Sequence, residues 1–126
     1  MYKRKAYLEN DMFVKVIDFD IDDYWLEWYY KLHSYEPRVV EVYGYNDRKI
    51  YMEYIDGDQM FSNANYETYA EMLDIGKRIL DFSKQNDVHF YHHDWHFGNF
   101  LIENKTRRMV LVDPDSFHLF ANGKWV

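Results

Sequence analysis

The chain has 126 residues, of which 48% are hydrophobic and 21% aromatic, so we expect one folded domain with a packed core. Its formal net charge of −7 disfavours nucleic acid and anionic membranes as partners, because phosphate groups are bound by Lys and Arg side chains. The absence of cysteine excludes disulfides and thiolate metal sites, and no apolar run is long enough to span a bilayer, so we expect a cytoplasmic protein.

The first half of the chain predicts a strand, a helix and a β-hairpin, at residues 12–17, 24–33 and 39–55. Lys15 lies in the middle of the predicted strand, between apolar neighbours. The helix follows a run of aspartates, which suit a helix N-terminus, and Pro37 prevents its continuation. Asn46 and Asp47 are typical turn residues and are expected to connect the two strands of the hairpin.

The second half predicts one long helix and three short strands, at residues 66–85, 88–92, 100–102 and 109–112. Asn65 is a suitable N-cap for the helix. Apolar residues at helical spacing predict its buried face, which would consist of Tyr66, Tyr69, Met72, Leu73, Gly76, Ile79 and Leu80. The tail at residues 116–126 is expected to be too short for another substantial element.

One segment concentrates residues suited to catalysis. His92 and Asp94 form a His-x-Asp pattern, Asn99 follows after four residues, and Asp113 ends the last predicted strand. This pattern resembles the catalytic loop and metal-binding strand of the protein-kinase-like superfamily. The resemblance extends in chain order over about residues 12–116.

The resemblance implies a role for each residue of this segment. Asp94 would orient the attacking hydroxyl and accept its proton, and His92 would be a structural brace of the catalytic loop. Asn99 and Asp113 would hold Mg²⁺, and Asp115 would assist them, because oxygen ligands are what this hard cation prefers.

The resemblance also implies a nucleotide site. Lys15 resembles the strand lysine that holds ATP phosphates, and Glu27 on the following helix is its expected ion-pair partner. The segment after the hairpin resembles the hinge between kinase lobes. Met52 would occupy the gate position, and the backbone of Glu53 and Ile55 would pair with adenine.

Several substitutions indicate small-molecule kinases, of the aminoglycoside- and choline-kinase type, as the most similar branch. His93 replaces the family arginine, His96 stands where those enzymes often carry histidine, and Pro114 and Asp115 follow Asp113 in place of Phe-Gly. No glycine-rich loop precedes Lys15. We therefore expect an α+β fold, a reduced two-lobed kinase-like core without the glycine-rich loop or the later C-lobe helices. Residues 1–55 would form the small lobe and residues 56–126 the reduced large lobe.

The expected function is Mg²⁺-dependent transfer of the ATP γ-phosphoryl group to a hydroxyl of an unknown small molecule or protein. Exposed apolar surface on so short a core would favour a homodimer. Two alternatives remain open. One is a catalytically degenerate pseudokinase that binds nucleotide or protein. The other is a metal-dependent hydrolase that binds Zn²⁺ or Fe through His92, Asp94 and His96, which would lie on one side of a strand.

Overall fold

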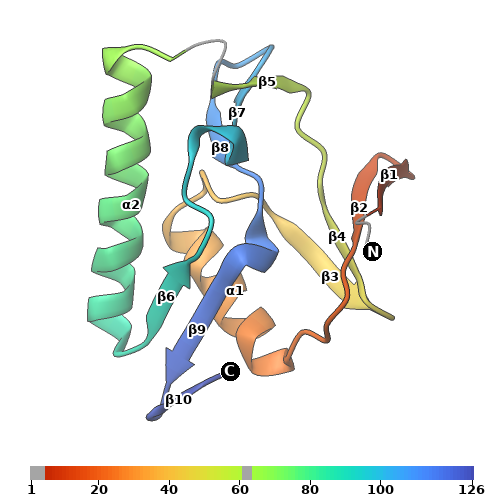
Figure 1. The fold of residues 1–126 in the computed structure, drawn as a ribbon, viewed down its shortest axis with the longest axis vertical. Helices are drawn as coiled ribbons and strands as arrows, with labels where there is room; N and C mark the ends of the chain where they lie inside the picture. The colour runs from red at the N-terminus through yellow and green to blue at the C-terminus, as the bar shows by residue number, and fades with distance from the viewer. Residues whose placement is uncertain (1–4, 61–63) are drawn as a thin grey trace.

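The computed structural model describes residues 5–60 and 64–126, which form a mixed α+β fold with two α-helices and three small antiparallel sheets. The helices and strands follow one another as β1 (Lys5–Glu9), β2 (Met12–Val16), α1 (Asp23–Tyr35), β3 (Val42–Asn46), β4 (Lys49–Glu53), β5 (Gly57–Gln59), α2 (Tyr66–Asn86), β6 (His89–His92), β7 (Phe100–Glu103), β8 (Met109–Leu111), β9 (Phe117–Ala121) and β10 (Lys124–Trp125). In Figure 1, α2 and the sheet of β1–β4 lie at opposite sides of the molecule, with α1 and β6–β9 between them. Within the described residues, no helix has both the length and the apolar character that a membrane span requires.

The first sheet has the strand order β1-β2-β4-β3, and all its neighbours are antiparallel. The predicted hairpin is confirmed, but its left-handed turn residues are Asp47 and Arg48, one position later than expected. Strand β1 was not predicted. Asn10 and Asp11, both with positive φ, join it to β2 in another tight hairpin. Strand β2 is therefore an internal strand, which places Lys15 between Ala6 and Ile50 of its two neighbours.

Helix α1 begins and ends as the sequence predicts, within two residues. The Asp22 side chain caps it by accepting a hydrogen bond from the Tyr24 N–H at 2.7 Å. Trp25, Tyr29 and Leu32 recur at helical spacing and are buried. The Tyr29 hydroxyl donates to the Val40 carbonyl at 2.7 Å, so the helix is fixed to the chain that leads into β3.

Helix α2 is confirmed in extent, but its predicted buried face is only partly correct. Asn65 caps it in a capping box with Thr68. The buried face consists of Met72, Ile75, Ile79, Phe82 and Ser83. Four other predicted positions turn to solvent, since the side chains of Tyr66, Tyr69, Leu73 and Leu80 are exposed, while Gly76 is partly buried next to Trp95. The face chosen by the tertiary contacts is rotated from the one that the apolar pattern favoured.

The prediction for the tail at residues 116–126 is wrong, because the tail forms the two strands β9 and β10. Strand β9 pairs antiparallel with β6 and with β10, and Asn122 and Gly123 form the turn between β9 and β10 with positive φ. An Asn-Gly pair between short apolar runs is a hairpin signal that the sequence analysis missed.

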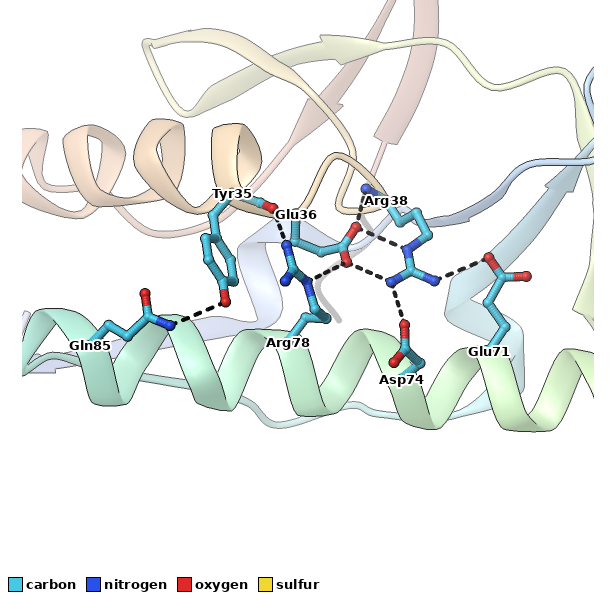
Figure 2. Close-up of polar contacts among 7 residues, drawn as sticks. All are labelled: Tyr35, Glu36, Arg38, Glu71, Asp74, Arg78 and Gln85. Carbon is cyan, nitrogen blue, oxygen red and sulfur yellow. Dashed lines mark hydrogen bonds and ion pairs between the residues drawn. The ribbon is translucent and has the colours of Figure 1, made fainter.

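An ion-pair network joins the two helices (Figure 2). Glu36, which is 2% exposed, accepts hydrogen bonds from the Arg38 side chain at 2.7 and 3.0 Å. Arg38 reaches on to Glu71 and Asp74 of α2 at 3.3 and 2.8 Å. Arg78 of α2 lies 3.7 Å from the same Glu36 carboxylate. The carboxylate after α1 is thereby held between guanidinium groups from both parts of the chain.

Candidate functional site

The loop after β6 is connected to the strand end after β8 by one histidine. His92 accepts a hydrogen bond from the Asp94 N–H at its Nδ1 atom, at 3.2 Å, so its proton lies on Nε2. The Nε2 atom then donates to the Asp113 carbonyl at 3.0 Å. Burial lowers the pKa of His92, against the opposing influence of Asp113, and keeps the ring neutral near pH 7. His92 thus positions Asp94 relative to Asp113, as a brace would.

Asp94 lies in the loop with its side chain about half exposed. Asn99 donates through its side-chain nitrogen to the Asp94 carbonyl at 2.7 Å and to Oδ2 of Asp94 at 3.1 Å. His96 accepts from the Gly98 N–H at Nδ1, which leaves Nε2 to donate to Oδ1 of Asp94 at 3.2 Å. Each carboxylate oxygen keeps lone pairs for another donor, so a hydroxyl from solvent can still bind there.

The same hydrogen bonds fix the orientation of the Asn99 side-chain amide. Because its nitrogen donates to Asp94, its side-chain oxygen is the atom left to accept a hydrogen bond or to coordinate a metal ion. Its backbone carbonyl accepts from the Val112 N–H at 2.9 Å, which places Asn99 beside the residue before Asp113. The sequence analysis assigned Asn99 and Asp113 to one site, and in the structure the Asn99 backbone lies next to the residue that precedes Asp113.

Lys15 reaches across the molecule to the same site. Its ammonium nitrogen lies 2.5 Å from Oδ1 of Asp113 and 2.7 Å from Oδ1 of Asp115, although 98 and 100 residues separate them in sequence. The Lys15 side chain is 14% exposed, and the two carboxylates are almost fully buried. Ser116 adds a short hydrogen bond from its hydroxyl to Oδ2 of Asp113.

The two carboxyl groups are electrostatically unequal. Burial opposes ionisation of Asp113, but hydrogen bonds from Asp115, Lys15 and Ser116 outweigh it and hold its pKa well below the usual range. Burial raises the pKa of Asp115, and the neighbouring Asp113 raises it further against the attraction of Lys15. One ionised carboxylate beside a carboxyl that resists ionisation is an arrangement that an added cation would stabilise.

The expected ion pair between Lys15 and Glu27 is wrong. Glu27 has a side chain that is 63% exposed, and it contacts Lys31 one helical turn later at 3.5 Å. Tertiary packing instead brings Asp113 and Asp115 to the lysine. Spacing along a helix could not distinguish a Glu that faces the sheet from one that faces solvent.

Only some groups of the hinge-like segment at residues 52–55 form hydrogen bonds or ion pairs within the protein. Met52 is buried in β4, and Glu53 donates its N–H to the Glu41 carbonyl at 2.9 Å. The Glu53 carboxylate pairs with Arg108 at 2.9 Å, a contact that the sequence analysis did not anticipate. Among the described residues, no backbone hydrogen bond engages the N–H or the carbonyl of Ile55.

The hydrolase alternative loses its geometric basis. Strand β6 ends at His92, so Asp94 and His96 lie in the following loop and not on one side of a strand. Over residues 5–60 and 64–126, no group of three His, Cys, Asp or Glu side chains is arranged to hold a metal ion. A site of the magnesium type differs, since it needs only one or two carboxylates, an amide oxygen and substrate phosphates. Asn99, Asp113 and Asp115 fit that donor set.

No protein-family model matches the chain, and no curated protein sequence matches it significantly.

Ser116 is the residue of this site that the sequence analysis missed. A short 3-10 helix at Pro114–Ser116, with proline at its start, brings the Ser116 hydroxyl back to Asp113. The signal was present in the sequence, because Ser three residues after Asp across a Pro-initiated turn is a typical local hydrogen-bonding arrangement.

Proposed function

We propose that this protein is an Mg²⁺-dependent phosphotransferase that moves the γ-phosphoryl group of ATP to a hydroxyl. The observation that carries the proposal is the contact of Lys15 with Asp113 and Asp115, next to the loop that holds Asp94 and Asn99. Phosphoryl transfer needs cationic groups at the phosphates, oxygen ligands for the metal, and a carboxylate at the attacking hydroxyl. These residue types converge here from distant parts of the chain.

Each side chain would have a defined task. Lys15 would exchange its contact with the two aspartates for the ATP phosphates, which carry more negative charge. Asp113, Asp115 and the Asn99 side-chain oxygen would hold Mg²⁺, which neutralises phosphate charge when bound. Asp94 would bind the acceptor hydroxyl at its half-exposed carboxylate and take its proton as the hydroxyl attacks.

The arrangement of the chain supports a reduced kinase-like core. The lysine lies on an internal strand before α1, the hairpin β3–β4 leads into the hinge-like segment, and α2 precedes the loop that holds Asp94. The adenine would lie against Met52, with its edge at the backbone of Ile55. The tight β1–β2 turn at Asn10 and Asp11 would take the place of the glycine-rich loop.

The decisive experiment is calorimetric titration of ATP, with and without Mg²⁺, into the wild-type protein and Asp113→Ala. We expect Mg²⁺-dependent binding in the wild type and a loss of the Mg²⁺ dependence in the variant, because a metal ligand has been removed. Asp58→Ala is a matched control, since this exposed aspartate lies in β5 outside the site. Failure of the wild type to bind ATP would overturn the proposal.

The second candidate function is nucleotide binding without transfer. It is favoured by one observation, namely that the β1–β2 turn has only two residues and no glycine, which limits its reach over the phosphates. Binding of Mg-ATP without phosphoryl transfer to any hydroxyl or to water would support this pseudokinase.

A further inference from the structure

Two histidines outside the candidate site face each other at the sheet of β10, β9 and β6 (Figure 1). The Nδ1 atom of His93 lies 2.7 Å from the Nε2 atom of His118, and both residues are exposed. His93 directly follows β6, and His118 lies in β9. Neither residue has a task in the proposed phosphoryl transfer, so their contact calls for another explanation.

The main chain brings these two histidines together. Tyr91 of β6 is directly opposite His118 of β9. The His93 N–H donates to the Ser116 carbonyl at 3.1 Å, which continues the same antiparallel pairing by one step. His93 and His118 are therefore diagonal neighbours on one face of the sheet, because side chains two positions apart in a strand share a face. The Tyr91 ring stacks on His118 with 6.3 Å between the ring centroids, and the Trp125 ring meets it edge-on.

The facing nitrogens can both offer a lone pair without any change of charge. A neutral histidine carries one proton, on either ring nitrogen, so the present contact is a hydrogen bond that uses one inner proton. Transfer of that proton to the outer nitrogen of the same ring leaves two inner lone pairs. Burial lowers the pKa of His118, and His93 lowers it further, so a proton competes only weakly with a metal ion for this ring near pH 7.

The distance between the two nitrogens is close to that of a chelating pair. With metal–nitrogen distances of about 2.0–2.1 Å and ligand angles of about 90–110°, two imidazole nitrogens on one Zn²⁺ ion lie about 2.9–3.4 Å apart. The nitrogens of His93 and His118 therefore need to separate by only a few tenths of an ångström. The ring centroids are 4.9 Å apart, so the nitrogens now point almost directly at each other and each ring has to tilt. Both side chains are exposed and have room for this movement.

The structure assigns to His93 and His118 a binding site for Zn²⁺ or a similar divalent transition-metal ion, with imidazole ligands that such ions prefer. Water would complete the coordination, because both rings line a cavity of about 230 Å³. No Lys or Arg is among the residues described as lining this cavity, so no fixed cation there opposes the ion. A bound ion would tie β9 to the start of the loop that holds Asp94. The inference does not depend on the proposed function and can be tested without nucleotide.

The test is calorimetric titration of Zn²⁺ at pH 7 into the wild type, His93→Gln and His118→Gln. We expect one ion per chain in the wild type. Either variant should bind at least about tenfold more weakly, since even the loss of an outer-shell partner costs roughly 10- to 100-fold in metal affinity. The double variant should lose little further affinity, because one substitution already breaks the chelate. Mg²⁺ should not compete for this site, since it prefers oxygen ligands.

Two control variants separate this site from other metal-binding groups. His89→Gln removes another exposed histidine, from β6 itself, and should leave the Zn²⁺ affinity unchanged. Asp113→Ala should also leave it unchanged, because Asp113 belongs to the proposed Mg²⁺ site and does not line this cavity. A lower Zn²⁺ affinity in either control would contradict the assignment.

NMR on the wild type gives an independent location for the ion. Zn²⁺ should shift the ring resonances of His93 and His118 and the indole N–H of Trp125, which lies against the His118 ring. Unchanged Zn²⁺ affinity in both folded histidine variants, or its loss in His96→Gln instead, would overturn the inference. The absence of any binding at about 1 mM Zn²⁺ would overturn it as well.

Discussion

At the scale of single residues, two side chains of the site use different atoms for different hydrogen-bond partners. His92 accepts from one backbone group and donates to another, and Asn99 gives its nitrogen to Asp94 while its oxygen stays available. Such fully assigned hydrogen bonds fix the orientation of a ring or an amide more strongly than packing alone. Preorganisation of this kind is what an electrostatic catalyst needs.

The proposed role of Asp94 as the general base leads to the first residue-scale prediction. Asp94→Asn should lower the rate of phosphoryl transfer by about 10²- to 10⁴-fold, the usual contribution of a general base, while Mg-ATP affinity stays unchanged. The fold should persist because the side chain is about half exposed. Transfer rates and calorimetric affinities measured on the same preparation test this split. Undiminished turnover would remove Asp94 from the mechanism.

Glu36 carries the second residue-scale prediction, which concerns stability. Glu36→Gln removes a buried carboxylate that accepts charge-assisted hydrogen bonds from Arg38, and should lower the free energy of unfolding at pH 7 by about 1.5–3 kcal/mol. Glu27→Gln is the matched control. It removes an exposed carboxylate paired within one helix and should cost only about 0.3–0.5 kcal/mol.

The stability difference between the wild type and Glu36→Gln should also depend on pH, with a defined sign. Burial opposes ionisation of Glu36, but Arg38 outweighs it and holds the pKa of this carboxyl below its unfolded value of 4.5. The stabilisation is therefore complete above pH 4.5 and is lost as pH falls through the lower folded pKa. Urea unfolding at several pH values should show the wild type converging on Glu36→Gln in acid. A constant gap between them would contradict this account.

At the scale of elements, the local signals at the ends of helices and turns were dependable. Asn65 caps α2 as predicted, and one residue of the predicted aspartate run, Asp22, caps α1, because a side chain that accepts from its own backbone neighbours acts within a few residues. Gly57 in β5 reflects a different constraint. A Cβ at this position would lie 2.3 Å from the Ile102 carbonyl oxygen of β7, so the two strands approach closely only because the residue is glycine.

Gly57→Ala should therefore destabilise the protein by about 1–3 kcal/mol through overpacking against backbone that cannot move aside. Gly44→Ala in β3 is the matched control, since a Cβ there would meet nothing within 4 Å. Thermal unfolding of the two variants measures the difference. Equal melting temperatures would show that β5 can separate from β7 without cost.

At the scale of the whole molecule, residues 1–55 and residues 56–126 contribute to one core, and polar contacts cross between these two parts. Backbone bonds join Leu111 to Arg38 and Val40, while Lys15 and the Arg38 network form ion pairs across the same boundary. The site after β8 is therefore attached to the segment that follows α1. A movement of the segment that follows α1 should therefore also move Asp113.

Self-association also belongs to this scale, and the homodimer remains a prediction. The exposed apolar side chains of α2 are its expected contact, because water around them would be released on pairing. Leu73→Lys and Leu80→Lys should reduce the average mass measured by sedimentation equilibrium, and Gln85→Lys, which adds the same charge elsewhere on α2, should leave it unchanged. A monomeric wild type at high concentration would refute the prediction.

The sequence by itself determined the two helices, the Asn65 cap, the strands β2–β4 and β6–β8 and the grouping of His92, Asp94 and Asn99, because neighbouring residues decide these through local hydrogen bonds and periodicity. Only the tertiary structure decided which partner Lys15 takes, which face of α2 is buried and that the tail pairs with β6. The physical reason is that these choices depend on contacts between residues far apart in the chain, where several local patterns are equally compatible with the sequence. Glu27 and Asp113 were both suitable partners for a lysine, and packing brought only the aspartate within 2.5 Å.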